Sequence, residues 1–558
     1  MIGLVSPVMS PGYLVSRLAP LVLVATGCTE PGGVELLFEL PEKPELSPLT
    51  GDRLAQISLI TWDETGARTR DTRPLSEPGS GIDLGRLDVG SELTIGVELS
   101  SLGGRLIGFG RSTKTIVIDP DETIEVPISV RRPFAYVPGG GADPISALST
   151  TLATFDSTLD GLVGQPGDDA PEYKGEIESS MTTTAVAPTT DGKQLVVVGE
   201  SGGAGQLILV ATSLHESISV APIALAAAPV DVSVTAHGRF AIVAHDGAAG
   251  GVSIVDLEAV RAGSPDAVEF VPLGSVGAVS ASGQGEDAGR AFALIDRAPR
   301  RIDLLDGVSE RRSHRTARVG CDAPASSIAV LDLDNPAELG LRHTANGPIQ
   351  DIATSSDGSG VIIADACGDT VGVMDAETGA VQPLVSLLDA SSVAIQGKRV
   401  VAAGAVRSQT NTTIELVSVD IDGANESRVT LPQRQERGEL IADNTQSIEI
   451  VIDADDVLPY EIAAAPDGQH VAILAEAYHH AEERPFGVPP EMEIDTYEYL
   501  LVDASTGSLI QRVRTYCLIR VLSSTAFEPE CTVTPGQDAI PDRDRYVPFH
   551  LSLLYGAR

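Results

Sequence analysis

One stretch sets the pattern of this chain: Ile349-Gln-Asp-Ile-Ala-Thr-Ser-Ser-Asp-Gly-Ser-Gly-Val-Ile-Ile-Ala364. Apolar residues alternate with small or polar ones on either side of Asp357-Gly358. This predicts two half-buried strands joined by a hairpin turn, because glycine accepts positive φ there. A third apolar strand that ends in aspartate follows, Asp369-Thr-Val-Gly-Val-Met-Asp375. We therefore expect a small antiparallel sheet.

The same unit returns along the chain. Clear copies are Thr184–Val198, Pro229–Ala244 with Gly251–Leu257, and Pro459–Leu474 with Tyr499–Gly507. Weaker copies are Gly289–Ile295 with Ser327–Asp332, Ser392–Ala402 with Thr413–Val419, and an opening pair, Phe134–Val137 and Ala153–Asp156. One such sheet cannot bury both of its faces, whereas sheets stacked radially bury them and protect their edges. Seven copies predict a seven-bladed β-propeller over residues 133–558.

Two further features belong to this expected ring. The run Tyr546–Leu554 is apolar enough to close the ring beside the first blade. Insertions interrupt the repeats near residues 297–326, 430–456, 478–497 and 515–545, and we expect them as loops on the rims.

The order of strands and turn residues in these units resembles that of the YVTN/lactonase-type β-propellers. The closest matches are Ala465-Pro-Asp-Gly468 and Val373-Met-Asp-Ala-Glu-Thr-Gly379. The resemblance spans roughly the last three-quarters of the chain and implies the propeller fold. It implies much less about function, because one fold hosts many activities.

Composition limits the function classes. The chain has 558 residues, 78 Asp and Glu against 38 Lys and Arg, and a net charge of −40. Such a length predicts more than one domain. Such a charge repels phosphate backbones, so we expect no nucleic-acid partner.

The region before the repeats predicts a separate all-β domain, residues 34–132. Seven short runs have strand character: Val34–Phe38, Gln56–Trp62, Ile82–Leu87, Glu92–Leu99, Leu106–Phe109, Thr115–Ile118 and Thr123–Val130. Seven strands in about 100 residues are typical of a small antiparallel β-sandwich. The hallmark disulfide is absent, so its topology is left open.

The N-terminus predicts export. Arg17 precedes the apolar run Leu18–Thr26, and no apolar stretch reaches eighteen residues, which indicates a signal peptide over residues 1–27 rather than a membrane span. Val24-Ala-Thr-Gly-Cys28 resembles the bacterial lipobox, which implies cleavage before Cys28 and lipidation of that cysteine, with residues 28–33 as a tether. A plain signal peptide with an incidental cysteine is the alternative. Thr29, where an aspartate would signal inner-membrane retention, resembles sorting to the outer membrane, facing either the periplasm or the outside.

Four cysteines remain once Cys28 is lipidated. In an exported protein an even number favours disulfides. We favour Cys517 with Cys531, because that bond closes a short local loop, which leaves Cys321 with Cys367. A zinc site would need close pairs such as C-x-x-C, and the sequence has none.

Candidate chemistry is sparse. Gly199-Glu-Ser201-Gly-Gly203 matches the G-x-S-x-G hydrolase pattern, but glycines and a further strand follow it, which favours a hairpin turn. His479, His480 and Glu482 are the metal candidates, and a solvated loop is the preferred interpretation. Acidic runs at Glu449–Asp456 and Asp420–Glu426 lack a complete calcium loop. We therefore expect no cofactor, with calcium as the alternative.

Two function hypotheses follow. The first is a lipid-anchored, non-enzymatic propeller whose rim loops bind a protein, peptide or glycan of the cell envelope, touching the membrane through its lipid alone. The second is a lactonase-like hydrolase that uses the propeller channel. The first is preferred, because no converging catalytic residues are evident in the sequence, and the only tryptophan, Trp62, lies outside the repeats, unlike the blade-docking tryptophans of quinone-dependent propellers.

Overall fold

The chain folds almost entirely into β-strands in the computed structural model. It describes residues 21–25, 33–39, 54–63, 68–74, 92–102, 104–112, 116–117, 123–129, 133–138, 151–156, 177–178, 181–211, 216–217, 222–264, 267–282, 289–298, 321–333, 335, 339–355, 357–408, 411–432, 435–441, 447–453, 456–464, 470–481, 492–521, 527–529 and 552–553. The one helix in these ranges, α2 (Leu257–Arg261), has five residues. Within them, no helix is long and apolar enough to cross a membrane.

Seven sheets follow one another along the chain, and we call them blades 1 to 7. Blade 1 contains β9 (Pro133–Pro138), β10 (Thr151–Asp156), β11 (Ile177–Glu178) and β40 (Ser552–Leu553). Blade 2 contains β12 (Thr182–Pro188), β13 (Gln194–Ser201), β14 (Ala204–Ala211), β15 (Glu216–Ser217) and β16 (Ile223–Ala224). Blade 3 contains β17 (Pro229–Val234), β18 (Phe240–His245), β19 (Gly251–Asp256) and β20 (Val268–Pro272).

The next two blades have four strands each. Blade 4 contains β21 (Val276–Ala281), β22 (Arg290–Ile295), β23 (Ser327–Asp332) and β24 (Leu339–Thr344). Blade 5 contains β25 (Asp351–Thr354), β26 (Gly360–Asp365), β27 (Thr370–Asp375) and β28 (Val381–Ser386).

Blades 6 and 7 are joined at their edges. Blade 6 contains β29 (Ser392–Gln396), β30 (Arg399–Arg407), β31 (Thr412–Asp420) and β32 (Ser427–Thr430). Blade 7 contains β35 (Asp456–Ala464), β36 (His470–Ala481), β37 (Met492–Asp503) and β38 (Leu509–Val521). A single parallel pair, Thr412 with Asp456, links the two sheets.

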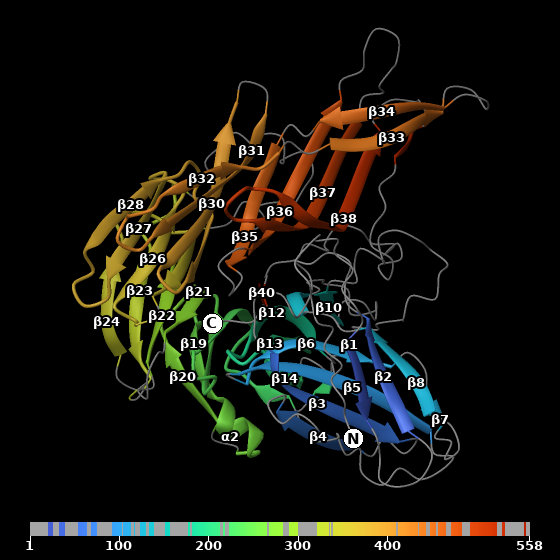
Figure 1. Cartoon of the computed structure of the whole chain (residues 1–558). Coiled ribbons are helices and arrows are strands. Elements are labelled where there is room, and N and C mark those ends of the chain that lie inside the picture. Colours follow the sequence, from blue (N-terminus) through green and yellow to red (C-terminus); the bar gives the residue numbers. More distant parts are fainter. Residues whose placement is uncertain are drawn as a thin grey trace.

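The blades form a ring, which confirms the predicted seven-bladed propeller. The first strand of each blade lies against the first strand of the next, in the order β12, β17, β21, β25, β29 and β35. Figure 1 shows the successive sheets arranged around one centre. β40, from the C-terminal end, pairs with β9 and also contacts β35 and β12. The end of the chain thus closes the ring beside the first blade, as the apolar run there predicts.

The turns explain why the repeat has its particular residues. At the end of the first strand, the hydroxyls of Thr189, Thr235 and Ser355 each accept the main-chain N–H that opens the second strand, at 3.1, 3.1 and 2.9 Å. In two of these turns an aspartate, Asp191 or Asp357, accepts the hydroxyl of that residue at 2.7 Å. The Asp-Gly pair therefore marks a hairpin turn that is stabilised by hydrogen bonds from its own side chains.

The aspartate that ends the third strand caps the next turn. Asp375 accepts the N–H groups of Glu377 and Thr378, and Asp503 accepts those of Ser505 and Thr506. The hydroxyl and N–H of Thr378 lower the pKa of Asp375. This Asx-turn explains why the sequence Asp-x-x-Thr-Gly recurs after the third strand.

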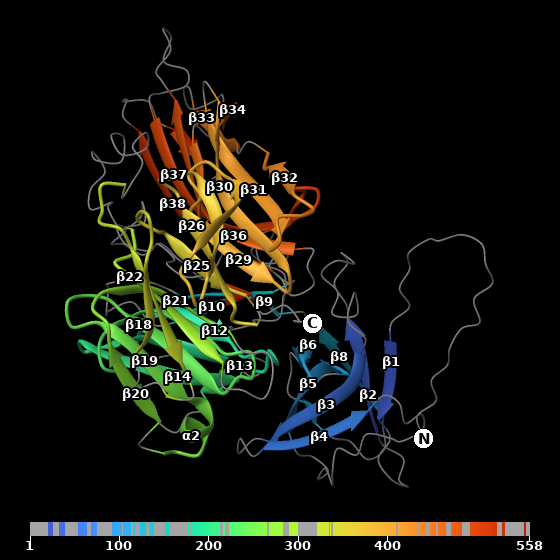
Figure 2. The same ribbon diagram turned by 90° about the vertical axis from the view of Figure 1, so that its left-hand side faces the viewer.

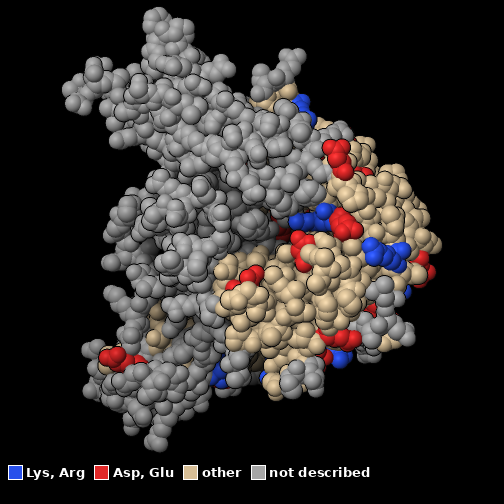
Figure 3. Space-filling view, turned by 180° about the vertical axis from the view of Figure 1, so that it is seen from behind, with Lys and Arg blue, Asp and Glu red and all other residues tan. Residues whose placement is uncertain are grey.

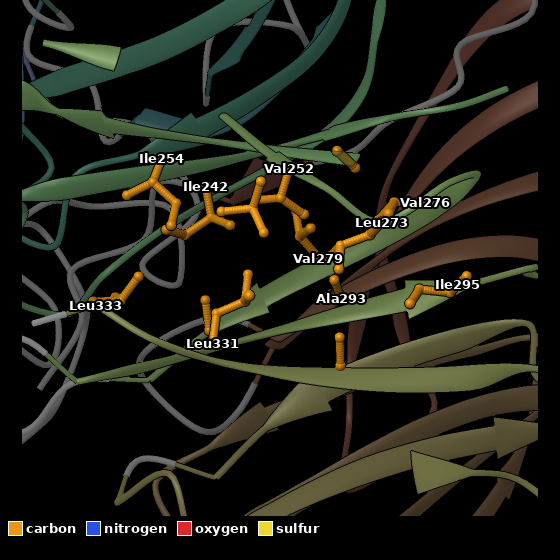
Figure 4. Packing of buried hydrophobic residues seen from close by; sticks show 14 of the residues in the cluster. Ile242, Val252, Ile254, Leu273, Val276, Val279, Ala293, Ile295, Leu331 and Leu333 are labelled. Carbon is orange, nitrogen blue, oxygen red and sulfur yellow. The ribbon is translucent and has the colours of Figure 1, made fainter. Parts of the chain in front are cut away.

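Most of the core lies between blades. Figure 4 shows Ile242, Val252 and Ile254 of blade 3 packed with Ala293, Ile295 and Leu331 of blade 4. Equivalent clusters join blades 2 and 3, 4 and 5, 5 and 6, and 6 and 7. Each sheet buries its faces only against its neighbours, so the ring is the smallest stable unit.

The N-terminal unit consists of two sheets. One contains β3 (Leu54–Asp63), β4 (Arg68–Pro74), β5 (Glu92–Ser101), β6 (Leu106–Arg111) and β7 (Ile116–Val117). The other contains β1 (Leu21–Ala25), β2 (Gly33–Glu39) and β8 (Thr123–Ser129). A bridge from Ser112 to Ile128 joins the two sheets, and Leu59, Val97 and Ile128 are buried. The expected β-sandwich stays a prediction.

Details of this unit differ from the expectation. β2 and β8 pair in parallel, whereas the sequence suggested only antiparallel pairs. β4 was not predicted, because Arg68–Pro74 is polar and carries no apolar alternation. The predicted strand Ile82–Leu87 lies outside the described residues.

Three of the expected rim loops contain strands. Residues 430–456 include the hairpin of β33 (Gln435–Ile441) and β34 (Ser447–Asp453), to which β39 (Phe527–Pro529) adds a third strand. Residues 478–497 extend β36 and β37 beyond the length of the other blades, and β38 runs on to Val521. Figures 1 and 2 show these strands projecting at the top, opposite the N-terminal unit.

Candidate functional site

The two faces of the ring are defined by the direction of the first strands. Side-chain bonds join equivalent positions of neighbouring first strands, so these strands run the same way from β17 to β35. We call the face where the first strands begin the insertion face, and the face where they end the turn face. The tight Asp-Gly turns lie on the turn face.

The long insertions leave from the insertion face. The strand ends that flank four long insertions lie on this face: the end of β22 and start of β23, the end of β32 and start of β35, the end of β36 and start of β37, and the end of β38 and start of β40. The end of β10 and the start of β11, which flank one further long connection, lie on the turn face. Because loops carry function on a rigid scaffold, the insertion face is the candidate site.

The N-terminal unit joins the other face. β8 ends at Ser129 and β9 begins at Pro133 on the turn face. The N–H of Leu106 in β6 donates to the carbonyl of Asp191, in the Asp-Gly turn of blade 2, at 2.9 Å. The N-terminal unit is therefore attached on the side of the ring away from the insertions.

Polar side chains join the first strands around the channel. The carboxylate of Asp231 accepts the N–H groups of Val232 and of Val279 in the next blade, both at 2.8 Å. Ser233 accepts the N–H of Ala281 at 3.1 Å, and Ser280 accepts that of Thr354 at 3.0 Å. The inner edge of each blade would otherwise present unpaired N–H groups.

The same connection continues through blades 5 to 7. Asp351 accepts the N–H of Val393 at 3.0 Å and the hydroxyl of Ser392 at 2.7 Å. The hydroxyl oxygen of Ser392 in turn accepts the N–H of Ile462 in blade 7 at 3.1 Å. The carboxylate of Asp351 therefore links blades 5 and 6 directly, and Ser392 extends this connection to blade 7.

A β-bulge recurs just before these links. The pairing register shifts by one residue at Thr184, Val230 and Gly277, within the first three residues of β12, β17 and β21, and at Tyr460 in the middle of β35. At Gly277 the guanidinium of Arg297 donates to the carbonyl at 2.9 Å, and an added Cβ would lie 2.6 Å from that of Arg297. Bulges often lie next to functional sites because they redirect side chains.

A disulfide joins two blades on the insertion face. Cys321, at the end of the 296–326 insertion, is bonded to Cys367 in the hairpin loop of blade 5. Asp365 accepts the N–H groups of Cys367 and Gly368 at 3.1 and 2.7 Å and shapes that loop. The predicted Cys321–Cys367 pair is therefore present.

His245 and Ser253 form a buried Ser–His pair. His245 has no exposed surface; its Nε2 is 2.7 Å from the hydroxyl of Ser253 and its Nδ1 is 3.3 Å from the carbonyl of Ala228. Phe270 packs edge-on against the imidazole. Burial lowers the pKa of His245, only partly offset by the carbonyl of Ala228. A substrate cannot reach this pair, which ties blade 3 to the segment before it.

The G-x-S-x-G pattern lies in a hairpin turn, as expected. Ser201 ends β13, and Gly202 and Gly203 have φ of +61° and +83° before β14 begins. There is no strand-to-helix elbow at this position, so the hydrolase interpretation has no structural support.

Two of the metal candidates lie at adjacent positions of one strand. His479 and His480 lie in β36, opposite Ile494 and Glu493 of β37, and Glu482 lies outside the described residues. Neighbouring positions of a strand belong to opposite faces of the sheet. Among the residues that the structure describes, no group of three His, Cys, Asp or Glu could hold a metal ion.

The remaining candidates stay predictions. Asp420 binds Arg399 and Asn425 rather than forming an open acidic loop. Cys517 lies in β38, opposite Thr496, whereas Cys28 and Cys531 lie outside the described residues.

Charges on the described surface are mixed. Figure 3 shows acidic and basic side chains interspersed on the side seen from behind. Several are paired, such as Arg399 with Asp420 at 3.1 Å and Arg239 with Asp256 at 3.3 Å. Exposed pairs of this kind contribute little to stability.

Comparisons with known proteins give fold-level similarity only. No protein-family model matches the chain, and no curated protein matches its sequence. One similar solved structure is hydrazine synthase from Kuenenia stuttgartiensis, with 17% identity and a TM-score of 0.36, covering 55% of this chain and 78% of that one. Another is the Cps50 (Swd1) β-propeller domain from Myceliophteria thermophila, with 12% identity and a TM-score of 0.36, covering 59% of this chain and 86% of that one. A third is the structure of the RRP9 WD40 repeats, with 7% identity and a TM-score of 0.36, covering 60% of this chain and 81% of that one. The propeller assignment rests on the sheet order described above, and these similarities carry no argument about function.

Proposed function

We propose that this chain is an exported, lipid-anchored β-propeller that binds a protein, peptide or glycan of the cell envelope through its insertion face. The observation that supports this proposal is the asymmetry of the ring. Four long insertions leave from one face, and the N-terminal unit joins the other.

The N-terminal unit has the geometry of a spacer. β2 runs parallel to β8, and β8 is followed three residues later by the propeller strand β9. β2 therefore points toward the propeller, so its first residue, Gly33, lies at the end away from the propeller, about 20 Å from its last residue for seven residues of strand. A lipid on Cys28 would then hold the insertion face away from the membrane.

The insertions differ in charge. Residues 430–456 contain seven acidic and two basic residues. Residues 478–497 contain five acidic residues and one basic residue. Residues 297–326 contain seven arginines and four acidic residues. Blade 4 and blade 7 lie on different sides of the ring, so we propose a partner with a cationic region that docks beside blade 7.

The experiment is cross-linking of the lipidated protein to its partners in intact envelopes. We expect cross-links to disappear when residues 299–320 or 482–491 are replaced by a short Gly-Ser linker. The matched control is the same replacement of residues 158–175 on the turn face, which should leave them unchanged. Cross-links that survive both insertion-face replacements, or that only the control removes, would contradict the proposal.

Anchoring has its own test. Metabolic labelling with a fatty-acid analogue should label the natural chain and not the Cys28→Ser variant, and that variant should leave the membrane fraction. Labelling of the variant would show that the anchor is elsewhere.

The lactonase-like hydrolase is not proposed. It needs charged groups free to converge at the channel, and Asp231 and Asp351 are bound to neighbouring blades. Hydrolysis of a lactone from a test panel, measured with and without a divalent metal ion, would support the hydrolase hypothesis.

A further inference from the structure

The strand at the outer edge of the three-stranded sheet comes from the predicted signal peptide. β1 pairs antiparallel with β2 in a continuous register, from Leu21 opposite Phe38 to Ala25 opposite Val34. The strand order is β1-β2-β8, so β1 is the only neighbour that this sheet gives β2 on that side. β2 therefore has a place on its edge that fits an extended apolar segment.

Export as proposed above would remove that neighbour. Cleavage before Cys28 removes Leu21–Ala25 and leaves the sheet with β2 at its edge. An open edge presents a row of unpaired N–H and C=O groups that can pair with another chain.

β2 has few of the residues that usually protect an edge. Its sequence is Gly33-Val-Glu-Leu-Leu-Phe-Glu39, with Glu35 and Glu39 as its only charged residues, no proline or lysine, and three consecutive apolar residues. Natural edge strands avoid pairing through such residues, through bulges or through short length. β2 has seven residues and a regular register with both of its neighbours.

We propose that the edge of β2 in the processed protein is a site for strand addition, which takes an extended apolar segment of a partner polypeptide running antiparallel to β2. The register supplies a preference within that segment. The position held by Val24 is opposite Glu35, so a lysine or arginine there would form a cross-strand pair of opposite charge. This inference rests on the proposed processing, and its site is distinct from the insertion face.

The test uses the chain from Cys28 onward, with Cys28→Ser to prevent lipidation, and a labelled peptide of residues 18–27 with two added C-terminal lysines. We expect saturable one-to-one binding by fluorescence anisotropy. A peptide with proline at positions 22 and 24 should bind at least tenfold more weakly, because proline cannot donate to the ladder. A peptide with Val24→Lys should bind a few-fold more tightly than one with Val24→Glu.

The uncleaved chain is the matched control, since its own β1 occupies the edge. It should not bind the peptide. Equal binding by the uncleaved chain or by the proline peptide, or no binding by the processed chain, would overturn the proposal. So would dimerisation of the processed chain that excludes the peptide, because the occupant would then be a second copy.

A second experiment does not require the shortened chain to fold. A protease site replaces residues 29–32 in the full chain, which is cut after folding. We expect the N-terminal fragment to co-elute with the rest and to be displaced by excess peptide; immediate loss of the fragment would refute strand addition. Mass spectrometry of the exported protein reports separately whether cleavage before Cys28 occurs, so failure of processing is distinguishable from failure of this site.

Discussion

The carboxylate of Asp351 accepts the main-chain N–H of Val393 at 3.0 Å, across the boundary between blades 5 and 6. The same carboxylate accepts the N–H of Ile352 in its own strand at 2.9 Å. One side chain therefore satisfies donors in two blades that would otherwise face the channel unpaired. Neighbouring blades are joined by polar bonds between their first strands and by apolar packing further from the centre of the ring. Both kinds of contact hold the blades in place.

Asp351→Ala should destabilise the propeller. It leaves the N–H groups of Ile352 and Val393 and the hydroxyl of Ser392 without their acceptor, at a cost of about 1–3 kcal/mol for such groups. Asp351→Asn keeps one acceptor oxygen and should cost less. Urea unfolding measures the difference, with exposed Glu269→Ala as the control. Equal stability of Asp351→Ala and the control would show that the link contributes nothing.

Reduction of Cys321–Cys367 should lower stability. The bond closes a loop with a sequence separation of 46, and constraint of the unfolded chain by such a loop is worth about 4 kcal/mol as an upper figure. Denaturant unfolding of the Cys321→Ser/Cys367→Ser variant, compared with the natural chain with and without reductant, measures this contribution. The variant should be insensitive to the reductant at this site. An unchanged midpoint in the variant would refute the role of the bond.

Thiol counting tests the other predicted pair. If Cys517 and Cys531 are also bonded, the unfolded processed chain should show no reactive thiol before reduction and four after it, apart from the lipidated cysteine. Two reactive thiols before reduction would mean that Cys517 and Cys531 are free. The measurement is alkylation under denaturing conditions followed by mass spectrometry.

Stability should fall on mild acidification because of His245. Burial lowers the pKa of His245 in the folded protein, while the unfolded chain has a value near 6.5, so the unfolded state binds the proton more readily. The contribution is complete above about pH 6.5 and is lost as the pH falls below it, at up to about 1.4 kcal/mol per pH unit. Urea unfolding at pH 7.5, 6.5 and 5.5 measures this slope.

The control for this prediction is an exposed residue that does not titrate. Gln382 in β28 is exposed, so Gln382→Ala should keep the slope of the natural chain. His245→Gln should be less stable at pH 7.5 and should lose part of the slope. An identical slope in His245→Gln would assign the acid sensitivity to other groups.

The repeat was predictable because local chemistry enforces it. Asp-Gly turns, the Asp-x-x-Thr-Gly cap and alternating apolar strands each act within one blade, so each leaves a local signal. The ring and its closure by Ser552–Leu553 followed from the need of each sheet to bury its faces. The pairing of Cys321 with Cys367 followed from elimination, because four cysteines leave few choices.

Features that depend on distant partners left a weaker signal. Asp231 and Asp351 stand at the same position of the repeat, yet the N–H donors that their carboxylates accept lie 48 and 42 residues further along the chain. The strand β4 is polar because it lies at the edge of its sheet, where alternation is not required. The sequence marks insertions by length and loss of pattern; that they share one face follows only from the direction of the first strands.

The hairpin at Gly199-Glu-Ser201-Gly-Gly203 provides a direct test of structure against motif. Gly203 has φ of +83°, which costs a residue with a Cβ about 1–2 kcal/mol, so Gly203→Ala should lower the free energy of unfolding by that amount. Ser201→Ala removes only a hydroxyl at the end of β13 and should change stability by less than about 0.5 kcal/mol. If Ser201 were a nucleophile, Ser201→Ala would abolish covalent labelling by a fluorophosphonate probe, whereas a turn residue is not labelled in either chain. Labelling of the natural chain that Ser201→Ala removes would overturn the assignment of this segment as a structural turn.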